Sequence, residues 1–231
     1  MKTGILAVFS VLILAGSGLA QAKYGPGSHE AGFTFGAAIP LTKSDLTALG
    51  GKEEVAVKTG ISFSGKYLYH TSPEWAFGGE VGYSSFGDKE HDISDSGIII
   101  REGAKALSVE GVAKYTLLPE KKTRPYFIGG LGYGSLQQKT ETKPTAGFTW
   151  SDTGTTEYRT NYDESIGALA LSLGVGLESF VTDSLALGLE ARWRTLRTDE
   201  TVTDKIFASE WEIDASNSFI LTAGISWKFG N

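Results

Sequence analysis

The sequence predicts an all-β protein, an eight-stranded antiparallel up-and-down transmembrane β-barrel. Three observations lead to this prediction. Apolar and polar or small residues alternate in eight segments, which is the side-chain period of a strand. The connections between these segments alternate between long and short. No segment after the first 22 residues is long and apolar enough for a membrane helix, so a membrane location would require a closed barrel.

Residues 1–22 predict a cleavable signal peptide, not part of the fold. Lys2 supplies the positive charge, residues 5–14 form an apolar core, and Ala20-Gln21-Ala22 has the small-x-small pattern of a cleavage site. Cleavage after Ala22 leaves 231 − 22 = 209 residues, which form one predicted barrel domain, 23–231.

The composition excludes several classes of function. The chain has no cysteine, which excludes a disulfide-stapled scaffold, thiol catalysis and thiolate metal sites. With 27 Asp and Glu against 21 Lys and Arg, the chain is mildly acidic and gives no reason to expect nucleic acid as a partner. We also expect no cofactor and no bound metal.

The first four predicted strands share one design, in which large apolar side chains on one face oppose small or polar ones on the other. They span residues 30–39, 57–69, 75–86 and 104–117, and are joined by a loop at 41–56, a tight turn at 70–74 and a polar loop at 87–103. Their apolar faces consist of Phe33, Phe35, Ala37, Ile39, Val57, Ile61, Phe63, Tyr67, Tyr69, Trp75, Phe77, Val81, Tyr83, Leu107, Val109, Ala113, Tyr115 and Leu117.

The last four predicted strands continue the pattern. A basic turn at 118–124 leads to a strand that begins at Pro125; the others span 165–181, 185–196 and 217–229, with loops at 137–164 and 197–216 and a turn at 182–184. An even number of strands, with short turns at one end and long loops at the other, is typical of outer-membrane barrels. This rhythm predicts both termini in the periplasm and four long loops outside.

The polar face favours a membrane barrel over a soluble one that encloses a ligand. A soluble barrel needs a well-charged outer face, whereas this face consists mostly of Gly, Ala, Ser and Thr. Small residues suit the crowded interior of an eight-stranded barrel. Its few charges include both signs, as a paired internal network requires, and we predict that they form such a structural network in the lumen. They are Lys66, Glu80, Glu110, Lys114, Glu178, Glu190, Arg192 and Arg194.

The final strand carries a more specific pattern. Residues 222–229 resemble the C-terminal assembly signal of bacterial outer-membrane β-barrels, polar-x-Gly-x-x-aromatic-x-aromatic, through Thr222, Gly224, Trp227 and Phe229. The resemblance implies recognition by the barrel-assembly machinery. Gly230 and Asn231 follow, whereas the aromatic residue is usually the last one in that family.

The mature chain as a whole resembles the small eight-stranded outer-membrane barrels, namely the transmembrane domain of outer membrane protein A, the OmpX type and the opacity type. Besides the final strand, residues 125–133 resemble the Pro-Tyr-apolar-Gly-x-Gly strand that is frequent among them. The resemblance implies a place in the cell outer membrane, contact with its lipid and lipopolysaccharide, and loops that face the cell surface. The peptidoglycan-binding domain of outer membrane protein A is absent, and its tethering role is not expected.

Two segments are candidates for chemistry. His70-Thr71-Ser72 resembles the His-x-Ser element of outer-membrane lipid A deacylases and is followed by Glu74. It lies in a predicted periplasmic turn, however, on the side away from lipid A, and turn chemistry explains its Thr, Ser and Pro residues. His91 stands among acidic residues without the spacing of a Ca²⁺ loop, which favours a solvated acidic loop.

These patterns leave three functions open. The first is a structural or surface-interaction barrel without catalysis, which acts through its outer loops on a surface or host partner. The second is a narrow channel for small solutes, similar in class to OmpW-type barrels. The third, disfavoured, is a lipid A-modifying enzyme centred on His70 and Ser72.

Overall fold

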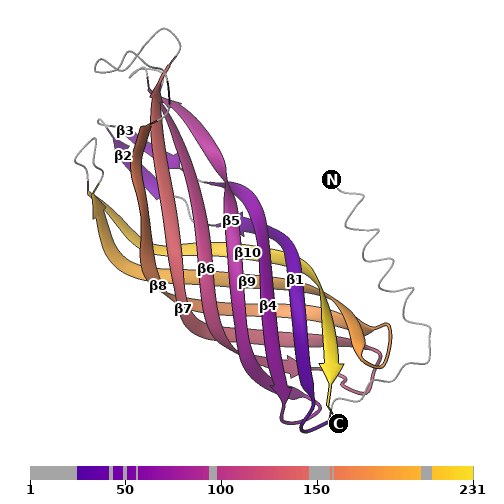
Figure 1. Ribbon diagram of the computed structural model, residues 1–231. Coiled ribbons are helices and arrows are strands. Elements are labelled where there is room, and N and C mark those ends of the chain that lie inside the picture. Colours follow the sequence, from indigo (N-terminus) through magenta and orange to yellow (C-terminus); the bar gives the residue numbers. More distant parts are fainter. Residues whose placement is uncertain are drawn as a thin grey trace.

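Eight long strands close into a single antiparallel up-and-down barrel in the computed structural model (Figure 1). The structure describes residues 25–41, 44–48, 51–55, 57–93, 98–145, 157, 159–203 and 210–230; the predicted signal peptide, 1–22, lies outside them. The strands of the wall are β1 (His29–Pro40), β4 (Lys58–His70), β5 (Trp75–Ile93), β6 (Ile98–Thr116), β7 (Thr123–Pro144), β8 (Arg159–Phe180), β9 (Leu185–Thr203) and β10 (Glu210–Phe229). The predicted fold class is therefore confirmed, and no helix of the described residues is long and apolar enough to cross a membrane.

The first and last strands of the wall close the barrel. β1 pairs with β10 from His29↔Phe229 to Pro40↔Ser218, and its other edge pairs with β4 from His29↔Tyr69 to Ala38↔Gly60. Each remaining strand pairs with its neighbour in the sequence.

The alternation of side chains separates an inner face from an outer one, as the sequence predicts. Outward residues such as Phe35, Val109 and Leu173 are 55%, 58% and 66% exposed, whereas inward residues such as Ala38 are fully buried. Large apolar side chains exposed over the whole circumference are stable only against lipid.

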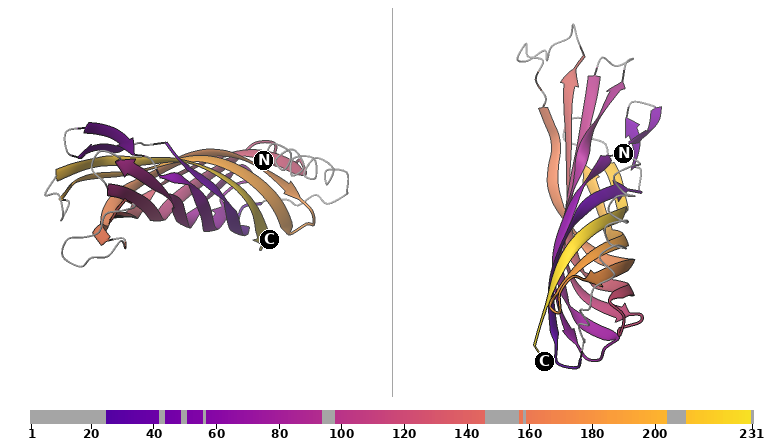
Figure 2. Two further views of the ribbon diagram at one scale, coloured as in Figure 1. Left: turned by 90° about the horizontal axis from the view of Figure 1, so that it is seen from above. Right: turned by 90° about the vertical axis from the view of Figure 1, so that its right-hand side faces the viewer.

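The apolar outer band ends well before the strands do. On β5 it runs from Trp75 to Tyr83, nine residues or about 27 Å of extended chain, a length typical of one membrane crossing. The next outward positions along β5 to β8 are polar: Ser85, Lys105, Gln137 and Ser165. The strands nevertheless continue to Ile93 on β5 and to Pro144 on β7. Above the band, β5 to β8 form a single sheet, here called the protruding sheet (Figures 1 and 2).

Several predicted loops are therefore wrong in their bounds. Residues 87–93, 98–103, 137–144, 159–164, 197–203 and 210–216, for which the sequence predicts loops, are strand. Residues 44–48 and 51–55 likewise form a two-stranded hairpin, β2 (Ser44–Ala48) and β3 (Gly51–Val55), within the predicted loop at 41–56. The physical reason is that strands outside the membrane have no lipid to face, so apolar alternation stops while backbone pairing continues.

The wall divides above the membrane band. Pairing of β7 with β8 extends to Thr142↔Arg159, and pairing of β9 with β10 extends to Thr203↔Glu210. Pairing of β8 with β9, in contrast, ends at Leu169↔Arg197. In Figure 1 the upper ends of β7 and β8 stand apart from those of β9 and β10. Residues 159–168 of β8 thus have one edge without a strand partner among the described residues.

At the opposite end of the barrel, three short turns connect β4 to β5, β6 to β7 and β8 to β9. The Thr71 and Val181 amides donate to the Trp75 and Leu185 carbonyls at 3.0 and 2.9 Å, which fixes the first and third turn. The Lys228 amide donates to the Ser184 carbonyl at 2.7 Å and so ties the end of β10 to a turn. In bacterial outer-membrane barrels the short turns face the periplasm, and this end is called the periplasmic end below.

Candidate functional site in the lumen

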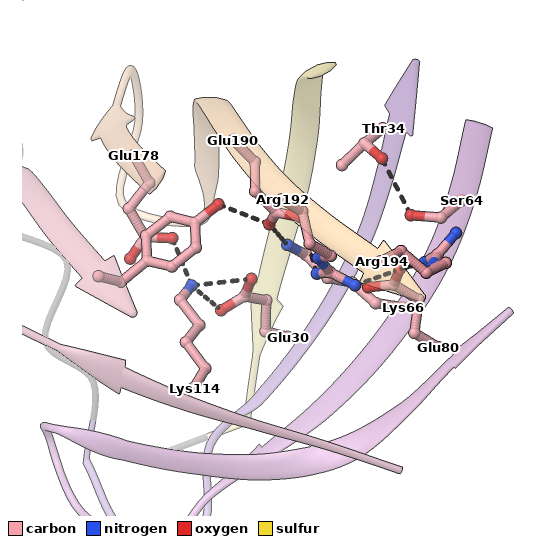
Figure 3. Close-up of polar contacts among 11 residues, drawn as sticks. Glu30, Thr34, Ser64, Lys66, Glu80, Lys114, Glu178, Glu190, Arg192 and Arg194 are labelled. Carbon is pink, nitrogen blue, oxygen red and sulfur yellow. Dashed lines mark hydrogen bonds and ion pairs between the residues drawn. The ribbon is translucent and has the colours of Figure 1, made fainter. Parts of the chain in front are cut away.

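The periplasmic part of the lumen centres on Lys114 of β6. Its ammonium group lies 2.6 Å from the Glu178 carboxylate and 3.0 and 3.2 Å from the two carboxylate oxygens of Glu30 (Figure 3). The Nε2 atom of His70 lies 3.4 Å from the same Glu30 carboxylate. All four side chains are almost completely buried, so the charges depend on one another for compensation.

Tyr126 of β7 links this cluster to the next. Its hydroxyl donates a 2.9 Å hydrogen bond to the Glu190 carboxylate, and its ring lies beneath two ammonium groups, with the Nζ atoms of Lys114 and Lys66 4.6 and 5.5 Å from the ring centroid. An aromatic ring with a polar tip can occupy a charged lumen because both its face and its hydroxyl find partners.

A chain of ion pairs continues across the lumen. Glu190 lies 3.2 Å from Lys66 and 2.7 Å from Arg192; Glu80 lies 2.7 Å from Arg192 and 3.2 Å from Arg194 (Figure 3). Arg194 also lies 2.9 Å from Glu110. Glu190 and Arg192 both lie on β9, whereas the other pairs join β9 to β4, β5 or β6 and so connect different parts of the wall.

Hydroxyl groups fill the remaining space around the charges. Thr34 and Ser64 share a 2.9 Å hydrogen bond, and the Ser84 hydroxyl donates to that of Ser62 at 3.0 Å. The Ser108 and Ser172 hydroxyls donate to the Glu110 carboxylate, the former at 2.9 Å. Together with the ion pairs they form what is called the charged layer below.

A second, apolar layer lies on the extracellular side of the charged one. Leu136, Ala168, Ala170 and Leu196 form one buried cluster, and Ala38, Phe86 and Ile220 form another. On each strand these residues lie farther from the periplasmic end than the charged ones: Leu196 follows Arg194 on β9, and Phe86 follows Glu80 on β5. This set of seven residues is called the apolar layer below.

A small cavity lies among the charges. A cavity beside Lys66, Tyr126 and Glu190 holds about 20 Å³. That is roughly enough for one water molecule, which needs about 10–15 Å³ on the same measure.

The structure places all eight sequence-predicted lumen residues in the charged layer and adds others that sequence reasoning missed. Glu30 and Tyr126 belong to it, and Arg124 lies below it with its guanidinium 4.5 Å from the centre of the Phe180 ring. Alternation could have found Glu30, which shares a face with Gly32 and Thr34. No sequence pattern predicts the contacts of Tyr126, because its hydrogen bond joins strands that are distant in the sequence.

His70 and Ser72 contact different carboxylates in the structure. The sequence predicts a turn at His70, whereas it is the last residue of β4, fully buried and directed at Glu30. The Ser72 hydroxyl instead donates to Glu74 at 2.9 Å and accepts hydrogen bonds from the Glu74 and Trp75 amides, an ordinary turn arrangement. The side chain of His91 lies outside the described ones, and no group of three or more His, Asp or Glu residues within the described part of the chain could hold a metal.

The residues of the predicted assembly signal lie on both faces of β10. Thr222 faces the lumen and is buried, whereas Trp227 and Phe229 face outward and are about half exposed. Phe229 stacks on His29 of β1, with the ring centroids 5.6 Å apart, at the seam where the barrel closes. Gly224 pairs with Thr34 of β1. That these residues act as a signal stays a prediction.

Two ionisable groups of the protruding sheet, Glu102 and Lys139, have a raised pKa. Burial raises the pKa of the Glu102 carboxyl from 4.5 to about 7, and the Lys89 ammonium offsets part of this rise. The Glu141 carboxylate, 2.6 Å away, raises the pKa of the exposed Lys139 ammonium.

Comparison with solved structures finds the same architecture in other proteins. OprG from Pseudomonas aeruginosa has a TM-score of 0.54 at 11% sequence identity, and the match covers 91% of this chain and 100% of that one. Neisserial surface protein A (NspA) matches with a TM-score of 0.47 at 16% identity, over 88% of this chain and 97% of that one. Ail, the attachment invasion locus protein of Yersinia pestis, matches with a TM-score of 0.46 at 14% identity, over 88% and 99%. At 11% identity the likeness to OprG shows the fold alone.

The sequence itself gives the family. No curated protein matches the chain. Residues 8–229, however, match the family described as "Outer membrane protein beta-barrel domain", which is nearly the whole chain. Together with the closed eight-stranded barrel and its apolar outer band, this match identifies the chain as a member of that family and a protein of the outer membrane.

Proposed function

We propose that this protein is a sealed outer-membrane barrel that binds a partner at the cell surface through its protruding sheet and has no catalytic role. The observation that carries the proposal is the edge of β8. Residues 159–168 pair with β7 on one side, and no described strand pairs with them on the other. This edge lies outside the apolar band, on the extracellular side of the membrane.

An unpaired strand edge offers a row of backbone N–H and C=O groups to another chain. An extended polypeptide segment can add to such an edge as a further strand, so that its backbone supplies the affinity and its alternate side chains the specificity. The partner class that fits is therefore an extended segment of a protein at the cell surface.

The lumen favours a sealed barrel over a narrow channel. A solute that crossed it would have to pass the apolar layer, with Leu136 and Ala170 almost fully buried, and then the ion pairs of Glu80 and Glu190. Opening this path would separate buried charges at a cost of several kcal/mol per ion, about the scale of the whole stability of many domains.

Strand addition can be tested with single cysteines, because the chain has none of its own. Peptides are selected from a random library on vesicles that carry the protein, and then resynthesised with a short thiol-reactive group. Ser165→Cys on β8 and Lys105→Cys on β6 are compared; both residues are exposed, and Gln137 of β7 lies between them in register. An added strand would lie about 5 Å from β8 but about 15 Å from β6.

The expected result is cross-linking at residue 165 and little at residue 105. Recovery of no peptide, or equal cross-linking at the two positions, would contradict recognition at the β8 edge.

A further inference from the structure

The lipid-facing side of the barrel wall contains a hollow that is separate from the lumen and from the protruding sheet. It has a volume of about 690 Å³ and opens outward across β5 to β9. Gly111, Ala113 and Gly129 form its floor, where the wall has almost no side chain. Large apolar side chains surround this floor: Phe77, Leu131, Leu171, Leu173 and Trp193.

The floor is open because its glycines face outward and carry no side chain. A Cβ atom added at Gly111 would meet nothing nearer than the Leu131 carbonyl oxygen at 3.7 Å, and one at Gly129 would meet the tip of Leu173 at 3.3 Å. The hollow is therefore not a space that the wall needs for its own packing. It is a surface into which a flexible apolar chain of the surrounding membrane can settle.

A cationic residue lies beyond the extracellular edge of the hollow. Leu173 pairs with Trp193 at its rim, and the next rows toward the cell surface are Leu171↔Thr195 and Leu169↔Arg197. Arg197 is exposed and lies four residues beyond Trp193, about 13 Å along the strand, where the apolar band ends. A guanidinium at this level of the membrane matches an anionic headgroup, which it can bind through two parallel hydrogen bonds.

We propose that this hollow and Arg197 form a binding site for a phosphorylated, acylated lipid of the outer leaflet, of the lipid A class. One acyl chain occupies the hollow between Phe77 and Trp193, and a phosphate group binds the Arg197 guanidinium. The affinity comes from the contact of the chain with the hollow and from the charge pair, since ordinary lipid tails are as apolar as the wall itself.

A second copy of the chain fits the same surface less well. In a two-fold interface each copy contributes the same patch, so the Arg197 residues of both copies would approach one another at the edge of the contact. A phosphorylated lipid meets the same guanidinium with the opposite charge.

Two pairs of variants test the site. Gly111→Leu fills the hollow, and Gly65→Leu is its matched control, because Gly65 also faces outward, lies away from the hollow and has no atom within 4 Å of an added Cβ. Arg197→Gln removes the guanidinium proposed to bind the headgroup. Its control, Lys105→Gln, removes an exposed cation that lies just beyond the apolar band on β6.

The measurement is native mass spectrometry of the protein as purified from outer membranes, followed by titration with lipid A, dephosphorylated lipid A and phosphatidylcholine. We expect the wild type to retain one lipid A molecule. Gly111→Leu weakens retention roughly five- to tenfold, and Arg197→Gln weakens it about fivefold for lipid A only. Both controls stay within about twofold of the wild type.

Three results would overturn the proposal. Equal retention by Gly111→Leu and Gly65→Leu would exclude the hollow. Equal loss of lipid A and its dephosphorylated form in Arg197→Gln would exclude the phosphate contact. A dimer that Gly111→Leu abolishes while lipid A retention is unchanged would assign the surface to a second copy of the chain.

Discussion

The two layers of the lumen fill the same barrel in opposite ways. In the charged layer, five carboxylates and four Lys or Arg cations pair across the barrel, with Glu80 and Glu190 each contacting two cations. In the apolar layer, residues such as Leu136 and Phe86 pack without polar contacts. The wall is the same closed sheet at both levels, so the difference lies only in the inward side chains.

The comparison shows two ways in which inward side chains can fill an eight-stranded lumen. Buried charges fix geometry because each one is costly unless its partner is correctly placed. Apolar side chains supply favourable burial without that requirement.

The largest expected effect comes from breaking the charged layer. Glu80→Ala leaves Arg192 and Arg194 without their shared carboxylate and should reduce the free energy of unfolding by about 3–5 kcal/mol. Urea unfolding of the protein in lipid vesicles measures the loss. Glu90→Gln is the control, since the Glu90–Arg101 pair is well exposed and should contribute less than about 1 kcal/mol. A loss at Glu80 no greater than the control would mean that the charged layer does not hold the barrel together.

A somewhat smaller effect is expected in the apolar layer. Leu136→Ala removes a side chain that is 1% exposed and should cost about 2–4 kcal/mol, part of it for the cavity left behind. The same unfolding measurement applies, with Leu131→Ala as the control because Leu131 faces outward and is 58% exposed. Equal costs for the two substitutions would show that the apolar layer is loosely packed.

The smallest effect concerns the protruding sheet, outside both layers. Because burial raises the pKa of Glu102 to about 7, the folded protein binds a proton there more tightly than the unfolded chain does. The stabilisation by the protonated form is therefore complete below pH 4.5 and is lost as the pH rises through about 7.

Glu102→Gln should remove this dependence. Between pH 5 and pH 8 the wild type should lose on the order of 1 kcal/mol more than the variant, after allowance for the partial exposure of the side chain. Urea unfolding at the two pH values measures the difference, and an identical slope for both proteins would refute the assignment to Glu102.

The membrane-embedded part of this fold is well predicted from the sequence. Lipid on one side and a crowded lumen on the other impose a strict alternation, so Phe33 to Ile39 on β1 and Phe219 to Phe229 on β10 show their faces directly. The same alternation puts Lys66, Glu80 and Arg192 on one side of the wall without naming their partners. Those partners depend on how the strands are staggered around the barrel, which one strand at a time does not reveal.

The protruding sheet was missed for the complementary reason. Residues 98–103 begin with three consecutive isoleucines, and residues 137–144 carry mostly charged and hydroxyl side chains. Neither segment alternates between apolar and polar residues, so the sequence pattern predicts loops where the structure has strands. The early end of the β8–β9 pairing, on which the proposed function rests, is likewise a property of backbone register and leaves no mark in either strand's composition.

Single-channel recording tests the central claim of a sealed lumen most directly. Residues 23–231, the predicted mature chain, are refolded in detergent, folding is checked by a heat-sensitive shift in gel mobility, and the protein is inserted into a planar bilayer. Because the charged and apolar layers fill the lumen, we expect the folded protein to give no discrete current steps. Reproducible steps from folded wild-type protein would contradict the account and make the charged layer a path for ions.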